Sequence, residues 1–421
     1  MIEKYYNGVI EQVAGGIGNV EHNSILVRYS NDFSIWDLES VNHYKDQTDI
    51  FFTCHEFSYN KIAEAYEPYL GLIRQMFHKY CSGTLEEFME ECDVYKLQRP
   101  VFESYFEKGF CERTEQILID EVEYEQERMH SSIVTMLQKL SEICPIVIVL
   151  NRFQLASKST MQLTNRLLQT KNKNIGIVLG VNDVQSIPEF AHEEWDAICE
   201  SMDDRNMVYH IGNAGRNMEP DVMDYYSDYE SDDGYRKLNN LVYFLDFDQA
   251  DHHLSKIERR IKFDNFTISE KKHYQLLLLQ IMVSVLQRDI AKALESCEDL
   301  EKLQDQEKEG AFYYNFWMAT SYMYLGKLEE AMIYVQKAKE CGEALGDDFL
   351  VFRAELLKAQ NQMSGWCNIF FCAQDIEISD KLIEKLNAYH YKNHLAHIYI
   401  YAYDNKPEIV AKAYRSEAFL I

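Results

Sequence analysis

The sequence predicts an α/β domain with a parallel sheet, followed by an all-α region. In the first half, short apolar runs alternate with segments of helical spacing, which is typical of a parallel sheet joined by right-handed helical crossovers. From Leu238 onward, apolar residues recur at helical spacing and Pro407 is the only proline. The strands that we expect are Ser24–Tyr29, Ile50–His55, Ile146–Val149, Ile175–Asp183 and Asn206–Ile211.

Helices are expected between these strands. An N-terminal helix and turn extend to Asn23, and Ser34–Val41 follows the first strand. A long helical insert occupies residues 60–143, and within it Tyr66–Tyr80 has the apolar spacing of an amphipathic helix. The branched apolar run after Pro145 is typical of a strand that is buried on both faces.

An acidic segment divides the two halves. Glu219–Asp233 contains five aspartates, two glutamates and three tyrosines, and it has neither helical nor strand periodicity. We interpret it as a solvated linker or loop, with a docking strip for a basic partner as the alternative. The expected domains are therefore residues 1–218, an acidic linker over 219–237, and a helical region over 238–421.

One helical pair in the second half can be interpreted closely. Small residues at Ala319 and Ala331 let two antiparallel helices approach each other, and Gly326 permits the turn between them. This pattern resembles the tetratricopeptide repeat. Weaker copies centre on Ala293 and on Ala411, at spacings near 38 to 40 residues, so we expect an irregular tetratricopeptide-like solenoid.

Three segments of the first half carry a second resemblance. Ile148–Leu163 runs from an apolar strand into a short polar stretch and then a leucine-containing helix, with Asn151 and Arg152 directly after the strand. Gly180 near the end of the next strand is followed by Val181, Asn182 and Asp183. Between the first strand and its helix, the loop residues are Ser34, Ile35 and Trp36.

The order of these three segments resembles that in the signal-transduction ATPases with numerous domains (the STAND class), in their maltose-activator-like and LuxR-like branch. The resemblance implies a P-loop-NTPase-like, AAA+-like domain with a helical insert. Members of that class carry acids at the positions of Asn151 and Arg152 and a phosphate-sensing arginine near the position of Asp183. They carry a glycine, a lysine and a hydroxyl residue at the positions of Ser34, Ile35 and Trp36. This chain departs from the pattern at each of the three places.

Because the phosphate loop, the metal-holding acids and the sensor are all replaced, ATP hydrolysis is not expected. We therefore predict a pseudo-ATPase without a catalytic residue, cofactor or metal, whose degenerate nucleotide site comprises Ser34, Ile35, Trp36, Asn151, Arg152 and Asp183. Two alternatives stay open. The first half could be an α/β domain without ATPase ancestry, or it could be a sensor that still binds a nucleotide or another small molecule through Arg152.

Composition narrows the partners. The 69 acidic against 42 basic residues give a formal net charge of −27, which would repel nucleic acid and anionic membranes. No apolar run approaches the ~18 residues of a membrane span, and the N-terminus lacks the basic and then apolar order of a signal peptide. Ten scattered cysteines are typical of reduced thiols, so a cytoplasmic protein is expected.

Aromatic residues indicate a protein partner. The chain has 29 tyrosines and 22 phenylalanines, and clusters of them alternate around the expected helices. Exposed tyrosines on a solenoid favour recognition of a protein or peptide, and a homo-oligomer is left open. The alternative is that they fill the seams between helices. The candidate partner-binding residues are Tyr313, Tyr314, Trp317, Tyr399, Tyr401 and Tyr403.

The sequence stops at Ile421 within an expected helix and without a polar capping helix. We therefore expect a regulatory scaffold that forms the N-terminal part of a larger signalling protein. The resemblance implies that its output domain would bind DNA or make a cyclic dinucleotide.

Overall fold

The computed structural model describes residues 2–19, 23–30, 34–45, 47, 49–59, 61–113, 117, 119–170, 172–182, 188–203, 208–211, 228–229, 231–263, 266–367, 380–391 and 394–395. The chain forms two compact units. The first comprises residues 1–112 and 123–253, and the second comprises residues 113–122 and 254–421.

The first unit contains a five-stranded parallel sheet of order β2-β3-β4-β1-β5. Every neighbouring pair of strands is parallel, as the alternation of strands and helices predicts. The order places β4 between β1 and β3, so the ends of β1 and β3 flank β4. The strands are β1 (Ser24–Tyr29), β2 (Phe51–Glu56), β3 (Ile146–Asn151), β4 (Ile175–Asn182) and β5 (Val208–Ile211).

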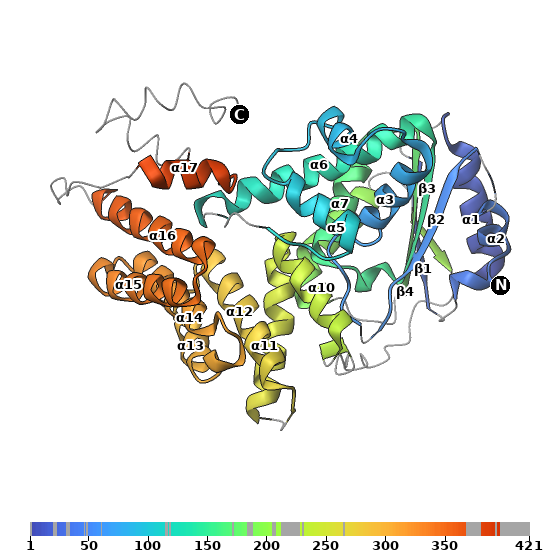
Figure 1. The fold of residues 1–421 in the computed structure, drawn as a ribbon. Coiled ribbons are helices and arrows are strands. Elements are labelled where there is room, and N and C mark those ends of the chain that lie inside the picture. Colours follow the sequence, from blue (N-terminus) through green and yellow to red (C-terminus); the bar gives the residue numbers. More distant parts are fainter. Residues whose placement is uncertain are drawn as a thin grey trace. The chain divides into compact units, whose positions relative to one another are not determined.

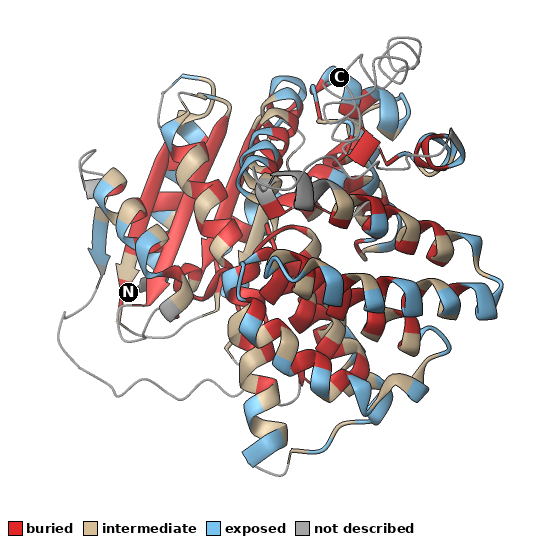
Figure 2. Ribbon diagram, turned by 90° about the vertical axis from the view of Figure 1, so that its left-hand side faces the viewer, coloured by how far each residue is buried: buried red, intermediate tan, exposed pale blue. Residues whose placement is uncertain are grey.

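Helices cover both faces of this sheet. Helices α1 (Ile2–Gly16) and α2 (Glu39–Lys45) lie on one face, and α3, α6 and α7 lie on the other (Figure 1). β3 and β4 are buried along their whole length, and most of the sheet is buried in Figure 2. The face toward α1 is lined by a cluster that includes Val27, Tyr29, Val147, Val149 and Val178.

The helices of the expected insert and those that follow it are also present. They are α3 (Tyr69–Tyr80), α4 (Leu85–Glu91), α5 (Arg99–Lys108), α6 (Val122–Ile143), α7 (Lys158–Gln169), α8 (His192–Asp203) and α10 (Asp232–Tyr243).

The predicted strands agree with the structure to within about two residues, the usual precision of strand ends. The expected helix Ser34–Val41 differs. The Ser34 hydroxyl accepts a hydrogen bond from the Trp36 N–H and caps a single 3₁₀ turn, Ile35–Asp37. Leu38 is then extended, with φ −77° and ψ 132°, and α2 begins only at Glu39. The loop after β1 is thus longer than the sequence pattern predicts.

The helical half was expected to begin at residue 238, but α10 packs within the first unit. Asn239 Nδ2 donates to the Cys111 carbonyl at 2.9 Å, and the Cys111 N–H donates to Asn240 Oδ1 at the same distance. Asn240 Nδ2 also donates to Glu64 Oε1 at 3.2 Å. These buried polar contacts hold α10 against the helical insert. Of the expected linker, residues 219–227 and 230 lie outside the described residues, and its last six residues, 232–237, form the start of α10.

The second unit consists of packed helices. α11 (Phe247–Phe263) belongs to it from Leu254 onward. The other helices are α12 (Glu270–Leu286), α13 (Ile290–Glu301), α14 (Gly310–Tyr324), α15 (Leu328–Leu345), α16 (Asp348–Cys367) and α17 (Asp380–Ala388), with short 3₁₀ turns at Ile119–Glu121 and Gln304–Gln306.

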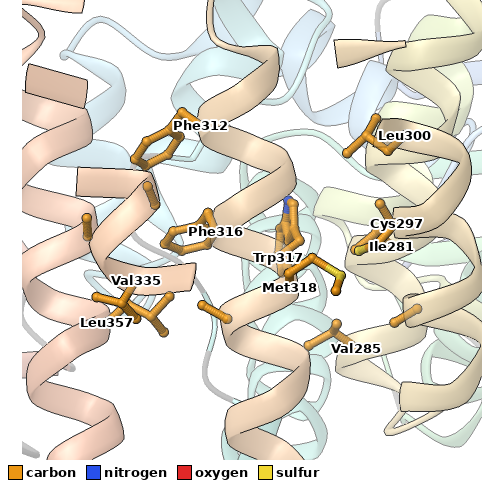
Figure 3. Packing of buried hydrophobic residues seen from close by; sticks show 14 of the residues in the cluster. Ile281, Val285, Cys297, Leu300, Phe312, Phe316, Trp317, Met318, Val335 and Leu357 are labelled. Carbon is orange, nitrogen blue, oxygen red and sulfur yellow. The ribbon is translucent and has the colours of Figure 1, made fainter. Parts of the chain in front are cut away.

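Helix α14 lies at the centre of this unit. Figure 3 shows Phe312 and Phe316 on the side of α14 toward Val335, and Trp317 on the side toward Cys297. Ala319 and Ala331 are fully buried, and Gly326 adopts φ 72° in the turn between α14 and α15. The helical hairpin expected from these three residues is present. The weaker copy around Ala411 lies outside the described residues.

Among the described residues, no helix combines the length and the apolar composition that crossing a membrane requires.

Candidate functional site

The carboxyl end of the sheet brings the expected nucleotide-site residues together. Side chains alternate between the two faces of a strand, so Asn151 shares the α1-facing side with Val147 and Val149. The strand register pairs Asn151 with Glu56, and Glu56 in turn follows Phe52 and Cys54 on that same face. Polar side chains from β2 and β3 therefore meet at one edge, where parallel sheets usually place their ligands.

Asn151 is tied to the end of β1. Tyr29 Oη donates a 2.7 Å hydrogen bond to Asn151 Oδ1, and both side chains are buried. The Asn151 amide nitrogen is buried and has no hydrogen-bond partner among the described residues. The end of β3 therefore presents a neutral amide held by a tyrosine, in the position where the resembled ATPases carry an acid.

Gly180 of β4 lies beneath this bond. A Cβ atom at this position would lie 2.6 Å from Asn151 Oδ1, and still closer to Tyr6 Oη from α1. Neither distance is compatible with a side chain, so glycine is required for packing. This glycine, which the sequence pattern associates with a sensor motif, here makes room for two polar side chains.

Arg152 pairs with a carboxylate that the sequence pattern did not single out. Its Nη1 lies 3.1 Å from Glu56 Oε1, and the two side chains are only 18% and 9% exposed. The guanidinium also lies 5.0 Å from the centre of the Tyr59 ring, within cation–π range. Arg152 adopts the left-handed conformation, with φ 53°, so the chain turns sharply directly after β3.

The same Glu56 carboxylate contacts the loop after β1. Its Oε2 accepts from Ser34 Oγ and from the Ile35 N–H, each at 3.4 Å. Ile35 is buried, whereas the Trp36 side chain is 50% exposed. The structure thus brings Ser34, Ile35, Asn151 and Arg152 together through Glu56 and Tyr29, while Trp36 points away from the core. Asp183 lies outside the described residues.

Burial favours the neutral forms of Tyr6, Cys54 and His55 near this edge. It raises the pKa of Tyr6 well above its usual value, with a further contribution from Tyr29, and it raises the pKa of Cys54 to about 12. Burial also lowers the pKa of His55 to about 4, against opposing effects of Glu56 and Glu64. These three groups therefore add no charge at this edge, where the ion pair is that of Arg152 with Glu56.

A second polar contact fixes the start of α7. Asp246 Oδ2 accepts from the Ser159 N–H at 2.7 Å, and Gln249 Oε1 accepts from the Lys158 N–H at 3.3 Å. Ser157 caps the same helix through the Thr160 N–H at 3.1 Å. The orphan donors at this helix start are therefore satisfied from within the chain. Sequence patterns could not identify Asp246, because it lies 87 residues from its partner.

The first unit also has a polar cavity of about 450 Å³ along α6, α7 and α8. Its lining includes Glu127, His130, Asn165, Arg166 and Glu194, which lie within the three helices and not at the ends of the strands. Arg166 is paired with Glu127, and Gln162 Nε2 donates to Glu194 Oε1 at 3.0 Å. This cavity is separate from the edge that gathers Asn151 and Arg152. Within the described part of the chain, no group of three or more metal-ligating side chains converges.

The candidate partner residues are only partly placed as expected. Trp317 is 5% exposed and belongs to the core of the second unit, so its assignment to a partner surface is wrong. The reason is that α14 is covered by helices on both sides. Tyr313 and Tyr314 are half-buried against the same core. Tyr399, Tyr401 and Tyr403 lie outside the described residues.

Comparison of the chain with protein-family models, with curated proteins and with solved structures finds no match.

Proposed function

We propose that this chain is a non-catalytic regulatory scaffold, in which an ATPase-like domain without nucleotide is joined to a tetratricopeptide-like arm that binds a protein or peptide. The observation that carries the proposal is the end of β3. Asn151 is fully buried there and hydrogen-bonded to Tyr29. A carboxylate that holds a magnesium ion needs open coordination positions, and the buried Asn151 amide supplies neither a charge nor an open position.

The sheet order also supports the ATPase-like part of the proposal. β4 lies between β1 and β3, so the ends of all three strands lie at the same edge of the sheet. The phosphate-binding loop and the metal-holding acid of such an enzyme follow these two strands. In this chain the corresponding positions, Ser34 and Arg152, both contact Glu56.

The interaction arm is supported by a row of tyrosines on α14 and α15. The rings of Tyr322 and Tyr334 stack with their centres 5.6 Å apart, and Tyr314 meets Tyr334 edge-on at 6.3 Å. All three are half-buried, and Ile333 beside them is exposed. Tyrosine gives a large contact area at a modest entropic cost, so this row is the described surface that best fits protein recognition.

The scaffold proposal is tested by thermal unfolding of the purified chain with ATP or ADP, with magnesium or with a chelator. We expect the same midpoint in every arm, because a ligand that does not bind the folded state cannot stabilise it. A rise that depends on magnesium would overturn the proposal. The sensor alternative predicts a rise with nucleotide in the chelator arm as well.

The interaction arm is tested by comparing the proteins captured by the wild-type chain and by the double variant Tyr322→Ala/Tyr334→Ala. The matched control is Tyr5→Ala, because Tyr5 is an exposed tyrosine on α1. We expect the double variant alone to lose a specific partner. Equal capture by all three proteins would contradict the role of this row.

A further inference from the structure

The Glu56 carboxylate is surrounded by the donors of an anion site. Its two oxygens receive the Arg152 guanidinium at 3.1 Å, and the Ser34 hydroxyl and the Ile35 N–H at 3.4 Å each. These donors come from two loops, one after β1 and one after β3, while the carboxylate comes from the end of β2. With 9% of its side chain exposed, Glu56 is directed into the protein.

A guanidinium, a hydroxyl and a backbone amide are the groups that bind carboxylate and phosphate oxygens alike. Arginine matches the planar fork of a carboxylate and the oxygens of a phosphate with the same set of N–H groups. The loop after β1, which would hold phosphate in the resembled ATPases, and the loop after β3, which would carry the metal-holding acids, therefore together present anion-binding groups.

We propose that Arg152, Ser34 and the Ile35 N–H form a phosphate-competent anion site that Glu56 occupies from within the chain. A tethered carboxylate competes at a high effective concentration, and its charge repels a second anion. The inference rests on the proposed function, because it explains how the nucleotide site is kept closed.

The site should persist when the carboxylate is removed. Tyr59 lies against the Arg152 guanidinium, and the left-handed turn at Arg152 fixes where the side chain begins. Ser34 is held by its own bond to the Trp36 N–H at 3.3 Å. The donors are thus positioned by contacts that do not involve Glu56.

The test is a titration of inorganic phosphate into the full chain and into Glu56→Gln, followed by calorimetry. We expect Glu56→Gln to bind phosphate at least about tenfold more tightly than the wild type, and the double variant Glu56→Gln/Arg152→Gln to lose the gain. The matched control is Glu64→Gln. Glu64 is 10% exposed and paired with Arg236, but Asp233 and the Gly109 carbonyl also hold that arginine. We expect no gain in this control.

Two results would overturn the inference: equal phosphate affinity in the wild type and Glu56→Gln, or a gain that survives in the double variant. If Glu56→Gln does not fold, Glu56→Ala is a second variant that removes the carboxylate from the site. If neither folds, phosphate is titrated into the wild type while the carboxylate ¹³C resonance of Glu56 is followed. A shift that saturates at high phosphate concentration, as phosphate displaces the carboxylate, is then the expected result, and a resonance that stays unchanged would contradict the inference.

The outcomes separate this inference from the proposed function. Magnesium-dependent binding of ATP by the wild type would overturn the proposed function. A failure of Glu56→Gln to bind phosphate would overturn only the closed anion site.

Discussion

Tyr29 Oη donates a 2.7 Å hydrogen bond to Asn151 Oδ1 and so joins the ends of β1 and β3 across the intervening strand β4. The bond passes over Gly180, the position at which a side chain would collide with it. An ATPase site would keep this space for phosphate and metal. Here the space is filled by two neutral side chains that hold the sheet edge together.

The variant Tyr29→Phe tests this bond. It removes the hydroxyl and leaves a buried amide oxygen without its donor, so we expect the free energy of unfolding to fall by about 1 to 3 kcal/mol. Denaturant unfolding measures the change. The control Tyr5→Phe alters an exposed tyrosine on α1 and should change stability by less than about 0.5 kcal/mol. Similar small effects for both variants would show that the buried bond contributes nothing.

The variant Gly180→Ala tests the close packing beneath the bond. The added methyl group would meet Tyr6 and Asn151, so we expect a loss of about 1 to 3 kcal/mol or more in the free energy of unfolding. The matched control is Gly71→Ala in α3, where a Cβ meets nothing within 4 Å. Alanine at that helical position should stabilise the protein by about 0.5 to 1 kcal/mol. Opposite signs for the two variants are the expected result, and a stabilising Gly180→Ala would contradict the packing.

The sequence predicted the strands well because their signal is local. Runs such as Ile146–Val149 are long enough in branched apolar residues to identify a buried strand without further information. Asn151 and Arg152 follow that run after Leu150, so the same local signal places them at the end of β3. What the sequence could not supply is the partners of these side chains. Tyr29 and Glu56 reach them only because the strand order brings β1, β2 and β3 to one edge.

Local signals also misplaced two features. The expected helix at Ser34 is interrupted at Leu38, whose extended backbone separates the turn Ile35–Asp37 from α2, and no local sequence signal marks this break. Trp317 was assigned to a surface because aromatic residues surround α14 in the sequence. A helix that neighbouring helices cover on both sides needs apolar residues around most of its circumference, so many aromatic residues are also expected in such a buried helix.

The Asp246 carboxyl group makes the free energy of unfolding decrease as the pH rises. Burial raises its pKa to about 6, so between about pH 4 and pH 6 the folded state binds a proton that the unfolded state has released. The carboxyl group therefore stabilises the fold at low pH, and this contribution is lost as the pH rises through about 6.

The variant Asp246→Asn removes this titration and keeps an oxygen that can accept the Ser159 N–H. We expect the stability of the wild type relative to this variant to fall by up to about 3 kcal/mol between roughly pH 4 and pH 7. Unfolding by denaturant at a series of pH values measures it. The control Asp248→Asn, at a more exposed carboxylate nearby, should retain the wild-type dependence. Parallel curves for the wild type and Asp246→Asn would contradict the buried charge.

Two histidines give a dependence of the opposite sign. Burial lowers the pKa of His55 and of His130 to about 4. The unfolded state binds protons that the folded state does not, so stability is lost as the pH falls below about 6.5. For His55→Gln/His130→Gln, we expect the variant to lose less stability than the wild type between roughly pH 7 and pH 5, by about 1 to 3 kcal/mol. An equal loss would contradict the burial of these rings.

The variant Ala319→Leu tests the seam between α14 and α15. Ala319 is fully buried, so added methyl groups would force the two helices apart and lower the free energy of unfolding by about 1 to 3 kcal/mol. Circular dichroism during denaturant unfolding measures the loss. The control Ile333→Ala changes an exposed residue of α15 and should have an effect near about 0.5 kcal/mol or less. A neutral Ala319→Leu would show that the hairpin does not pack closely there.

The central claim is that the edge of the sheet which resembles a nucleotide site is closed. Isothermal titration calorimetry of the purified wild-type chain with ATP and ADP, with and without magnesium, tests it most directly. The account predicts no saturable heat with either nucleotide at millimolar concentration. Stoichiometric binding that requires magnesium would contradict it.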